Sequence, residues 1–139
     1  MSYIEKIKRS GREANPFFRL MGIDVVSLSE GRAAIRMEIR GDMLNGENFL
    51  QGGMFTALAD EAMVLAIYSV LEKNQKIATI SESTSFMRGA GPGDTLAAEG
   101  ILIKKGRRIA FAEGLVKIEG KGDVLSRTSA AFAITTPHS

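Results

Sequence analysis

With 139 residues, 45% of them hydrophobic and 24% charged, the chain has the size and composition of one globular domain. The absence of cysteine excludes disulfides, thiolate catalysis and cysteine-ligated metal, and it is consistent with a reducing cytoplasm. The net charge of +2 comes without the dense basic stripe of a nucleic-acid-binding protein. We therefore expect a single cytoplasmic domain over residues 1–139 that has no nucleic-acid partner.

The first segment is charged and amphipathic, and it lacks the apolar run that a secretory signal needs. Apolar residues recur at spacings of three and four from Ile4 to Met21, which predicts a short helical lead-in over residues 1–16 and a break at Asn15-Pro16. The longest apolar run, residues 62–71, is too short to span a bilayer, so we expect neither export nor a membrane segment.

The next segments have the period-two pattern of strands. Residues 23–28 are rich in β-branched side chains, and residues 34–40 alternate so that Ile35, Met37 and Ile39 face a core. A polar loop then leads to residues 52–71, which lack proline and are apolar almost all round, as in a central helix enclosed by other structure.

The remainder predicts strands over 77–86, 95–103, 108–119 and 124–135, joined by short glycine-containing turns that favour an antiparallel meander. The fold class is therefore α+β, with a curled antiparallel sheet wrapped around one long helix. Such a sheet leaves an open edge and a half-covered face, which a second copy of the chain commonly covers, so we expect a homodimer.

The sequence excludes several kinds of catalytic centre. The single histidine is His138, which leaves a Ser-His-Asp triad, a histidine-ligated metal and histidine base catalysis without their central group. Neither a phosphate-binding GxxxxGK[ST] loop nor a GxGxxG fingerprint is present. Carboxylates remain as the acid and base groups, and we expect no metal.

Asp60 is the carboxylate that stands out, because it lies midway along the apolar helix, where an ionised side chain needs a partner, water or a cleft. It is either a site residue or a structural one, which pairs with Arg88 or another cation or lies where the helix face simply reaches the surface. The adjacent Glu61 lies about 100° round the helix and is better explained as solvated or structural.

Gly52-Gly53 begins the same helix, where first-turn amides have no internal acceptor and can stabilise an oxyanion. The pair could equally be a flexible turn. Eight residues separate Gly52 from Asp60, or about 12 Å of helix, which is too far for both to act on one carbonyl. If both are catalytic, the Asp60 of one chain must meet the Gly52 of another.

The segment from Asn45 to Ala62 resembles the NxxGxxHGGxxxxLxDxA signature of hotdog-fold thioesterases of the phenylacetate-pathway (PaaI) type. Residues 86–94 are similar to a strand end and turn of the same family. The resemblance covers about residues 17–136. It implies a hotdog fold and the hydrolysis of an aryl- or medium-chain acyl-CoA, with coenzyme A as part of the substrate and no separate cofactor.

The resemblance also implies roles for individual residues. Asp60 would be the general base or the nucleophile, and the Gly52 amide would polarise the thioester carbonyl. Asn45 would orient the thioester or the water, unless it only caps a loop, and Thr79 would place the water beside Asp60. Gln51 and Asn48 depart from the signature, which has His and Gly there, and a glutamine cannot shuttle a proton.

Coenzyme A needs cations for its phosphates, which strand-end residues could supply, although each could also be an ordinary turn charge. The candidate CoA-binding residues are Gly53, Arg88, Gly89, Lys104, Lys105, Arg107 and Arg108, and the candidate acyl-pocket residues are Phe18, Phe55 and Met63. We expect a homodimer or a dimer of dimers. The alternative function is a non-catalytic acyl-CoA sensor or carrier of the same fold, and a hydratase is disfavoured because it relies on a catalytic histidine.

Overall fold

The computed structural model describes residues 1–137, and His138 lies outside this range. Three helical segments open the chain, namely α1 (Tyr3–Ser10), the 3-10 turn η1 (Gly11–Ala14) and α2 (Pro16–Met21). The predicted break is confirmed, because the Asn15 side chain caps α2 by accepting from the Phe17 and Phe18 amides. Within residues 1–137 no helix is both long and apolar enough to cross a bilayer.

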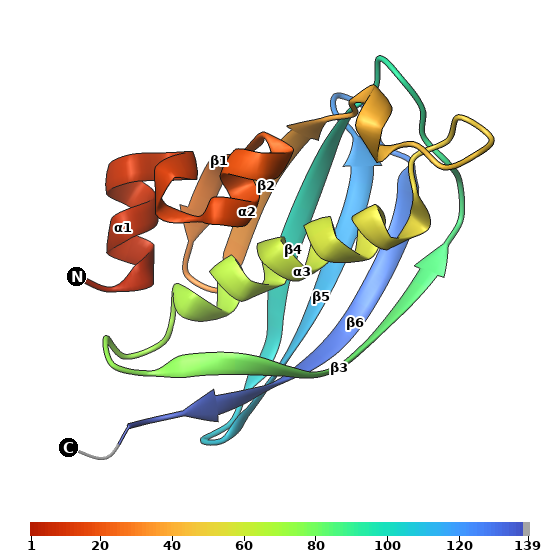
Figure 1. Ribbon diagram of the computed structural model, residues 1–139. Coiled ribbons are helices and arrows are strands. Elements are labelled where there is room, and N and C mark those ends of the chain that lie inside the picture. The colour runs from red at the N-terminus through yellow and green to blue at the C-terminus, as the bar shows by residue number, and fades with distance from the viewer. Residues whose placement is uncertain (138–139) are drawn as a thin grey trace.

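Six strands form one antiparallel sheet in the order β1-β2-β4-β5-β6-β3. The sheet curls around the helix α3 (Gly52–Tyr68), which crosses its concave side (Figure 1). The predicted arrangement, a curled antiparallel sheet around one long helix with a short N-terminal helix, is confirmed. The strands are β1 (Ile23–Ser29), β2 (Arg32–Glu38), β3 (Lys76–Phe86), β4 (Thr95–Lys105), β5 (Ile109–Ile118) and β6 (Val124–Thr135), and the 3-10 turn η2 (Gly41–Met43) follows β2.

The prediction of a simple meander after the helix is wrong for β3. Strands β4, β5 and β6 pair in chain order, but β3 pairs with β6 and β2 pairs with β4. The physical reason is that α3 crosses the concave side and carries the chain from one edge of the sheet to the other (Figure 1). Strands β1 and β3 are therefore the two edges.

The predicted core positions agree with the structure, since Ile35, Met37 and Ile39 are all buried. The central helix ends at Tyr68, three residues earlier than the sequence predicts. Ser69 explains this end, because its hydroxyl donates to the Ala66 carbonyl and accepts from the Gly31 amide. These two bonds tie the end of α3 to the turn between β1 and β2.

Helix α3 comes closest to the sheet at two glycines that face each other, Gly100 of β4 and Gly114 of β5. A Cβ on Gly100 would lie 2.1 Å from the Ala62 carbonyl oxygen, and one on Gly114 would lie 2.8 Å from the Cβ of Ala59. Only glycine therefore allows the helix main chain to rest on the sheet. Ala59 and Ala62 are fully buried on either side of residues 60 and 61, so this contact fixes where the two carboxylates lie.

We predict that Gly100→Ala lowers the free energy of unfolding by about 3 kcal/mol, because the new methyl group forces the helix away from the sheet. The matched control is Gly41→Ala, where an added Cβ meets nothing within 4 Å. It should change stability by less than about 0.5 kcal/mol. Urea unfolding of both variants checks this, and equal stabilities would contradict the close-contact explanation.

Candidate active site

The amide of Gly52 is the first of α3 and stands at the positive end of the helix dipole. Gln51 precedes it as the N-cap residue, and its side-chain Oε1 accepts a hydrogen bond from the Gly53 amide at 2.5 Å. Among residues 1–137 the Gly52 amide has no protein acceptor, so it is available to a ligand. Of the two adjacent glycine amides, only this one can polarise a carbonyl without breaking the cap.

The two glycines meet different constraints. A Cβ on Gly53 would lie 2.8 Å from the Gln51 Oε1 and would disrupt the cap, so the fold itself favours glycine there. A Cβ on Gly52 would only make an ordinary contact with the Phe86 ring, at 3.7 Å. The fold does not require glycine at position 52, which is consistent with a ligand that approaches this amide closely.

The loop before α3 is organised by Asn45. Its side-chain Oδ1 accepts hydrogen bonds from the amides of Glu47 and Phe49, at 2.9 and 3.1 Å. The interpretation of Asn45 as a loop-capping residue is therefore confirmed. Its Nδ2 group is not used by these bonds, and Asn45 is exposed, so a role in orienting a ligand stays a prediction.

Asn48 lies in the same loop with φ of 66°, the left-handed conformation, and is the sole non-glycine residue among residues 1–137 with a positive φ. Asparagine tolerates this conformation better than other residues with a side chain. This explains the departure from the signature, which has glycine at this position: the loop needs the backbone shape, and Asn48 can adopt it.

Residues 88–90 lie against this loop. The Leu50 amide donates to the Ala90 carbonyl at 2.8 Å, and Gly89 faces the Phe49 ring. The guanidinium of Arg88 pairs with Asp123 at 3.4 Å, so the alternative in which Arg88 neutralises Asp60 is wrong. Arg88 and Gly89 are thus close to the start of α3, as a shared binding site requires.

Asp60 is half-buried on α3 and faces β3, where the Thr79 hydroxyl lies 3.4 Å from its Oδ1. Both residues belong to the same chain, as the resemblance implies. Gly52 lies two helical turns away at the start of the same helix. The structure therefore brings Asp60 and Thr79 together, and separately Asn45, Gln51 and Gly52, but it does not bring these two groups together within one chain.

The sequence analysis missed Glu82, a second carboxylate on the same side of β3 as Thr79. Residues three apart on a regular strand face opposite sides, but β3 has a bulge between Thr79 and Ser81 that adds one unpaired residue. Thr79 is then opposite Phe132 and Glu82 opposite Ala130, both buried on the inner side of β6. Nothing in the sequence pattern signals this bulge.

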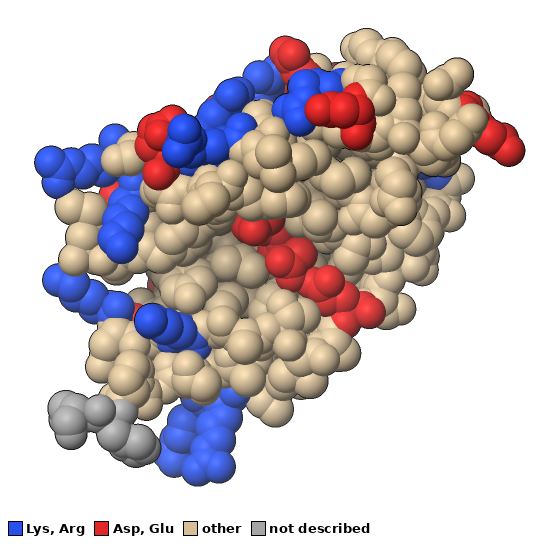
Figure 2. Space-filling view, in the orientation of Figure 1, with Lys and Arg blue, Asp and Glu red and all other residues tan. Residues whose placement is uncertain are grey.

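The carboxyl groups of Asp60, Glu61 and Glu82 form an acidic cluster between α3 and β3. Figure 2 shows acidic side chains following one another in the hollow at the centre of this face, with the basic residues around its margin. Burial, and then the nearby Asp60 charge, raise the pKa of Glu61 to about 7. Burial, and then hydrogen bonding to Asp60 and the Asp60 charge, raise the pKa of Glu82 to about 8. Glu61 is therefore half-buried rather than simply solvated.

A cavity of about 270 Å³ borders this cluster, between the N-terminal helices, α3 and the sheet. Its polar lining includes Glu61 and Thr79, and the remaining residues are Tyr3, Asn15, Val64, Tyr68, Ile77 and Phe132. The residues predicted to line an acyl pocket are elsewhere, since Phe18, Phe55 and Met63 are at most 3% exposed and belong to the core. Their contact with an acyl group stays a prediction.

The predicted phosphate-binding cations divide into two groups. Lys104, Arg107 and Arg108 line a cleft of about 430 Å³ at the β4–β5 turn, beside the exposed ring of Phe111. This turn and Arg88 lie at opposite ends of the sheet, separated by the length of β5, or about 30 Å at 3.3 Å per residue. Within one chain the two groups cannot bind the same phosphate.

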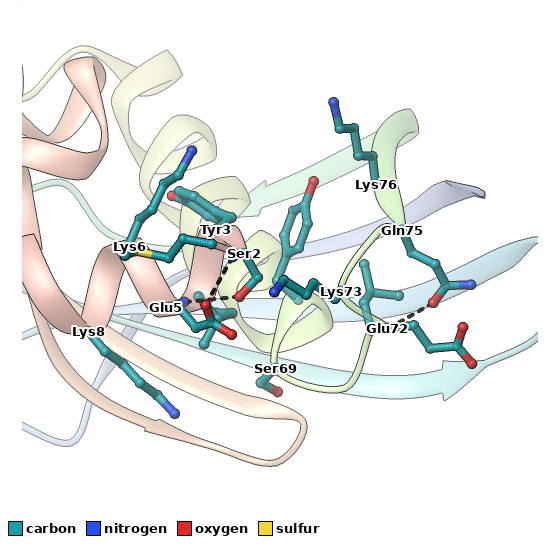
Figure 3. Close-up of a pocket in the computed structure, with 14 residues that line it drawn as sticks. Ser2, Tyr3, Glu5, Lys6, Lys8, Ser69, Glu72, Lys73, Gln75 and Lys76 are labelled. Atoms are coloured by element: carbon teal, nitrogen blue, oxygen red, sulfur yellow. Dashed lines mark hydrogen bonds between the residues drawn. The ribbon is translucent and has the colours of Figure 1, made fainter. Parts of the chain in front are cut away.

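A larger hollow, of about 570 Å³, lies between α1 and the turn from α3 to β3 (Figure 3). Its lysines alternate with Glu5 and Glu72, and Figure 3 shows Lys6, Lys8 and Lys76 pointing in different directions. Glu5 already accepts the Ser2 amide as part of the α1 cap. None of the predicted site residues lines this hollow.

Comparison with known proteins gives a consistent result. The thioesterase superfamily matches residues 47–125, which contain Gln51, Gly52, Asp60 and Thr79. The acyl-coenzyme A thioesterase PaaI of Escherichia coli is 33% identical over 92 residues, which are 65% of this chain and 62% of that relative. The chain therefore spans less than two thirds of the length of this relative.

Solved structures agree with this match. A mutant structure of the phenylacetic acid degradation protein PaaI from Thermus thermophilus is 27% identical, with a TM-score of 0.78 over 86% of this chain and 98% of the other. A Streptococcus mutans protein bound to acetyl CoA is 22% identical, with a TM-score of 0.75 over 84% of this chain and 91% of the other. At this lower identity the likeness shows the fold alone.

We predict that Asn48→Ala lowers the free energy of unfolding by about 1 kcal/mol, because alanine disfavours the left-handed conformation. Asn48→Gly should change it by less than about 0.5 kcal/mol, since glycine adopts this conformation readily. Gly46→Ala is the control in the same loop, because an added Cβ there meets no neighbour within 4 Å. Urea unfolding measures all three, and an Asn48→Ala variant as stable as Asn48→Gly would contradict the conformational explanation.

Proposed function

This chain belongs to the thioesterase superfamily, whose members are thioester hydrolases, and from that premise we propose that it hydrolyses acyl-coenzyme A thioesters. The name of the Escherichia coli relative supports an acyl-CoA substrate. We further propose that each site is shared between two copies of the chain. One observation carries this proposal: the available Gly52 amide and the Asp60 carboxylate lie on one helix, too far apart to act together.

In the proposed reaction the Gly52 amide of one chain donates to the thioester oxygen and stabilises the negative charge that develops there. Asp60 of the other chain either takes a proton from a water molecule whose oxygen attacks the carbonyl carbon, or attacks that carbon itself. The Thr79 hydroxyl, beside Asp60, would hold the water. The carbon–sulfur bond then breaks, coenzyme A leaves as the thiol with a proton from water, and the acyl group leaves as the acid, in the nucleophilic route after water hydrolyses the mixed anhydride with Asp60.

Strand β3 supports the proposal that a second copy completes the site. It is an edge strand of 11 residues whose outer edge has no partner strand among residues 1–137. Ile80 and Phe86 on this strand are each more than half exposed. A long, exposed, apolar edge is normally covered in native proteins, and pairing with a twofold-related β3 would do so. Assembly of such dimers into a dimer of dimers stays a prediction.

The two groups of cations fit the same arrangement. Because Arg88 and the β4–β5 turn lie at opposite ends of one sheet, coenzyme A on the composite site would meet only one of these groups from each chain. The acyl group would then enter the cavity that borders Thr79, which at about 270 Å³ suits a small acyl or aryl group.

We predict that the protein releases free thiol from acyl-CoA and that Asp60→Asn reduces this rate at least about 100-fold, because the neutral amide can act neither as base nor as nucleophile. A thiol-reactive dye measures release over a panel of aryl- and alkyl-CoAs. Binding of the same acyl-CoAs should persist in the variant, which shows that it is folded.

Undiminished turnover in Asp60→Asn would remove the catalytic assignment. Binding without turnover in the unmodified protein would favour the alternative, a non-catalytic acyl-CoA sensor or carrier.

The role of the amide can be tested without removing a side chain. We predict that Gly52→Pro lowers kcat about 100-fold or more, because proline has no N–H to donate. Proline is well tolerated at the first helical position, and Gln51, with φ of −59° and ψ of 131°, has the extended backbone that suits a residue before proline. Gly52→Ala is the matched comparison, since it keeps the N–H: it should lose activity only through the added methyl group beside the ligand, and much less than Gly52→Pro loses.

The same variant tests whether the site is shared. A heterodimer of one Asp60→Asn chain and one Gly52→Pro chain, purified through two different tags, has one intact composite site and should keep about half of the normal activity. A heterodimer of the double variant with an unmodified chain has none and should be nearly inactive. The opposite result for the two heterodimers would show that both groups act within one chain.

A further inference from the structure

Glu82 is a half-buried acidic group that the proposed reaction leaves without a role. The bulge in β3 turns its side chain to the inner side of the sheet, opposite Ala130. Its Oε1 atom has no accessible surface, and among residues 1–137 this atom has no hydrogen-bond partner. A carboxyl oxygen in such a place is costly when it carries charge, so the group favours its protonated form.

The surroundings of Glu82 contain negative charge and no compensating cation. From α3 it faces Asp60, with Glu61 beside it, and from β6 it faces only the neutral Thr128 and Ala130. None of the ion pairs among residues 1–137 involves these three carboxylates. Because two adjacent carboxyl groups cannot both ionise at low cost, the neighbouring Asp60 also favours the protonated form of Glu82.

We propose that Glu82 is a positioning residue: in its protonated form it donates a hydrogen bond to the Asp60 carboxylate and keeps that carboxylate oriented for catalysis. This inference rests on the proposed function, in which Asp60 is the catalytic carboxylate. Thr79 and Glu82 then contact Asp60 from the two sides of the bulge in β3. The Thr79 hydroxyl donates to the Oδ1 atom of Asp60. A carboxylate accepts about four hydrogen bonds, so lone pairs remain for the reacting water or carbonyl.

The arrangement makes activity depend on pH. Burial and the neighbouring Asp60 raise the pKa of Glu82 to about 8. When the pH rises above this value, Glu82 loses its proton. Asp60 then loses its donor and gains a negative neighbour, which opposes the negative charge that develops during thioester cleavage. We expect kcat/KM of the unmodified protein to fall as the pH rises through this range.

The test compares the pH profiles of three variants. Glu82→Gln keeps an N–H donor at every pH, so it should retain activity at pH 7 within about threefold and lose the fall at high pH. Glu82→Leu has no donor and should be about tenfold or more slower across the whole range. Glu61→Gln alters the other neighbour of Asp60 and should keep the fall near pH 8, whatever its rate at pH 7.

Thermal unfolding gives a second measurement that needs no activity. Glu82 has a higher pKa in the folded chain than its ordinary value of 4.5, so the folded state binds the proton more tightly. The stability from this group is fully present below about pH 4.5 and is lost as the pH rises towards about 8. Glu82→Gln retains only Glu61, whose pKa of about 7 means that its contribution is lost by about pH 7. Glu61→Gln retains Glu82, whose contribution continues to fall up to about pH 8. The fall in Tm between pH 6 and 9 should therefore be smaller for Glu82→Gln than for Glu61→Gln.

The possible failures are distinct. If Asp60→Asn remains active, the catalytic assignment of Asp60 fails and the role of Glu82 falls with it. If Asp60→Asn is inactive but Glu82→Gln has the same pH profile as the unmodified protein, only the role of Glu82 is overturned. An inactive Glu82→Gln that melts at the normal temperature would also overturn it, since an amide donor should substitute for the carboxylic acid.

Discussion

The contact between α3 and the paired glycines Gly100 and Gly114 is the constraint on which the rest of the structure depends. It sets the helix so close to β4 and β5 that no side chain fits between them. With Ala59 and Ala62 pressed against the sheet, the residues between them must leave the helix towards its sides. Asp60 therefore meets β3, and Glu61 meets the N-terminal helices. The position of the proposed catalytic carboxylate, Asp60, thus follows from the lack of side chains at Gly100 and Gly114.

The strip between α3 and β3 is polar in a core that is otherwise apolar. The Thr84 hydroxyl lies 2.8 Å from the hydroxyls of both Thr56 and Thr128, which links the helix to β3 and β6. The bulge before Ser81 adds Thr79 and Glu82 to the same strip. The threonine hydroxyls satisfy one another and Glu82 favours its protonated form, so the strip holds the half-buried Asp60 without an ion pair among residues 1–137. The negative charge that results is what an opposing helix N-terminus from a second copy would complement.

The two departures from the thioesterase signature have structural explanations near the start of α3. Gln51 caps the helix through the Gly53 amide, a role that does not need the proton transfer of a histidine. Asn48 supplies the left-handed backbone that glycine supplies in the signature. Together with Asn45, which binds two loop amides, these residues stiffen the approach to the Gly52 amide. The loop thereby presents one available donor in a defined direction, as stabilisation of an oxyanion requires.

The sequence by itself determined the elements and the alternation of Ile35 and Met37 towards the core, because periodicity is a local property of the chain. The helical rise between Gly52 and Asp60 is also local, and it led to the proposal that two chains share each site. Asp60 and Gly52 could be named in advance because one short motif contains both, and Thr79 could be named because it follows that motif. The tertiary structure alone decided that β3 pairs with β6, that Arg88 binds Asp123, and that Glu82 faces Asp60. These depend on a bulge, on a crossing of the sheet and on contacts between residues distant in sequence, and no local pattern encodes them.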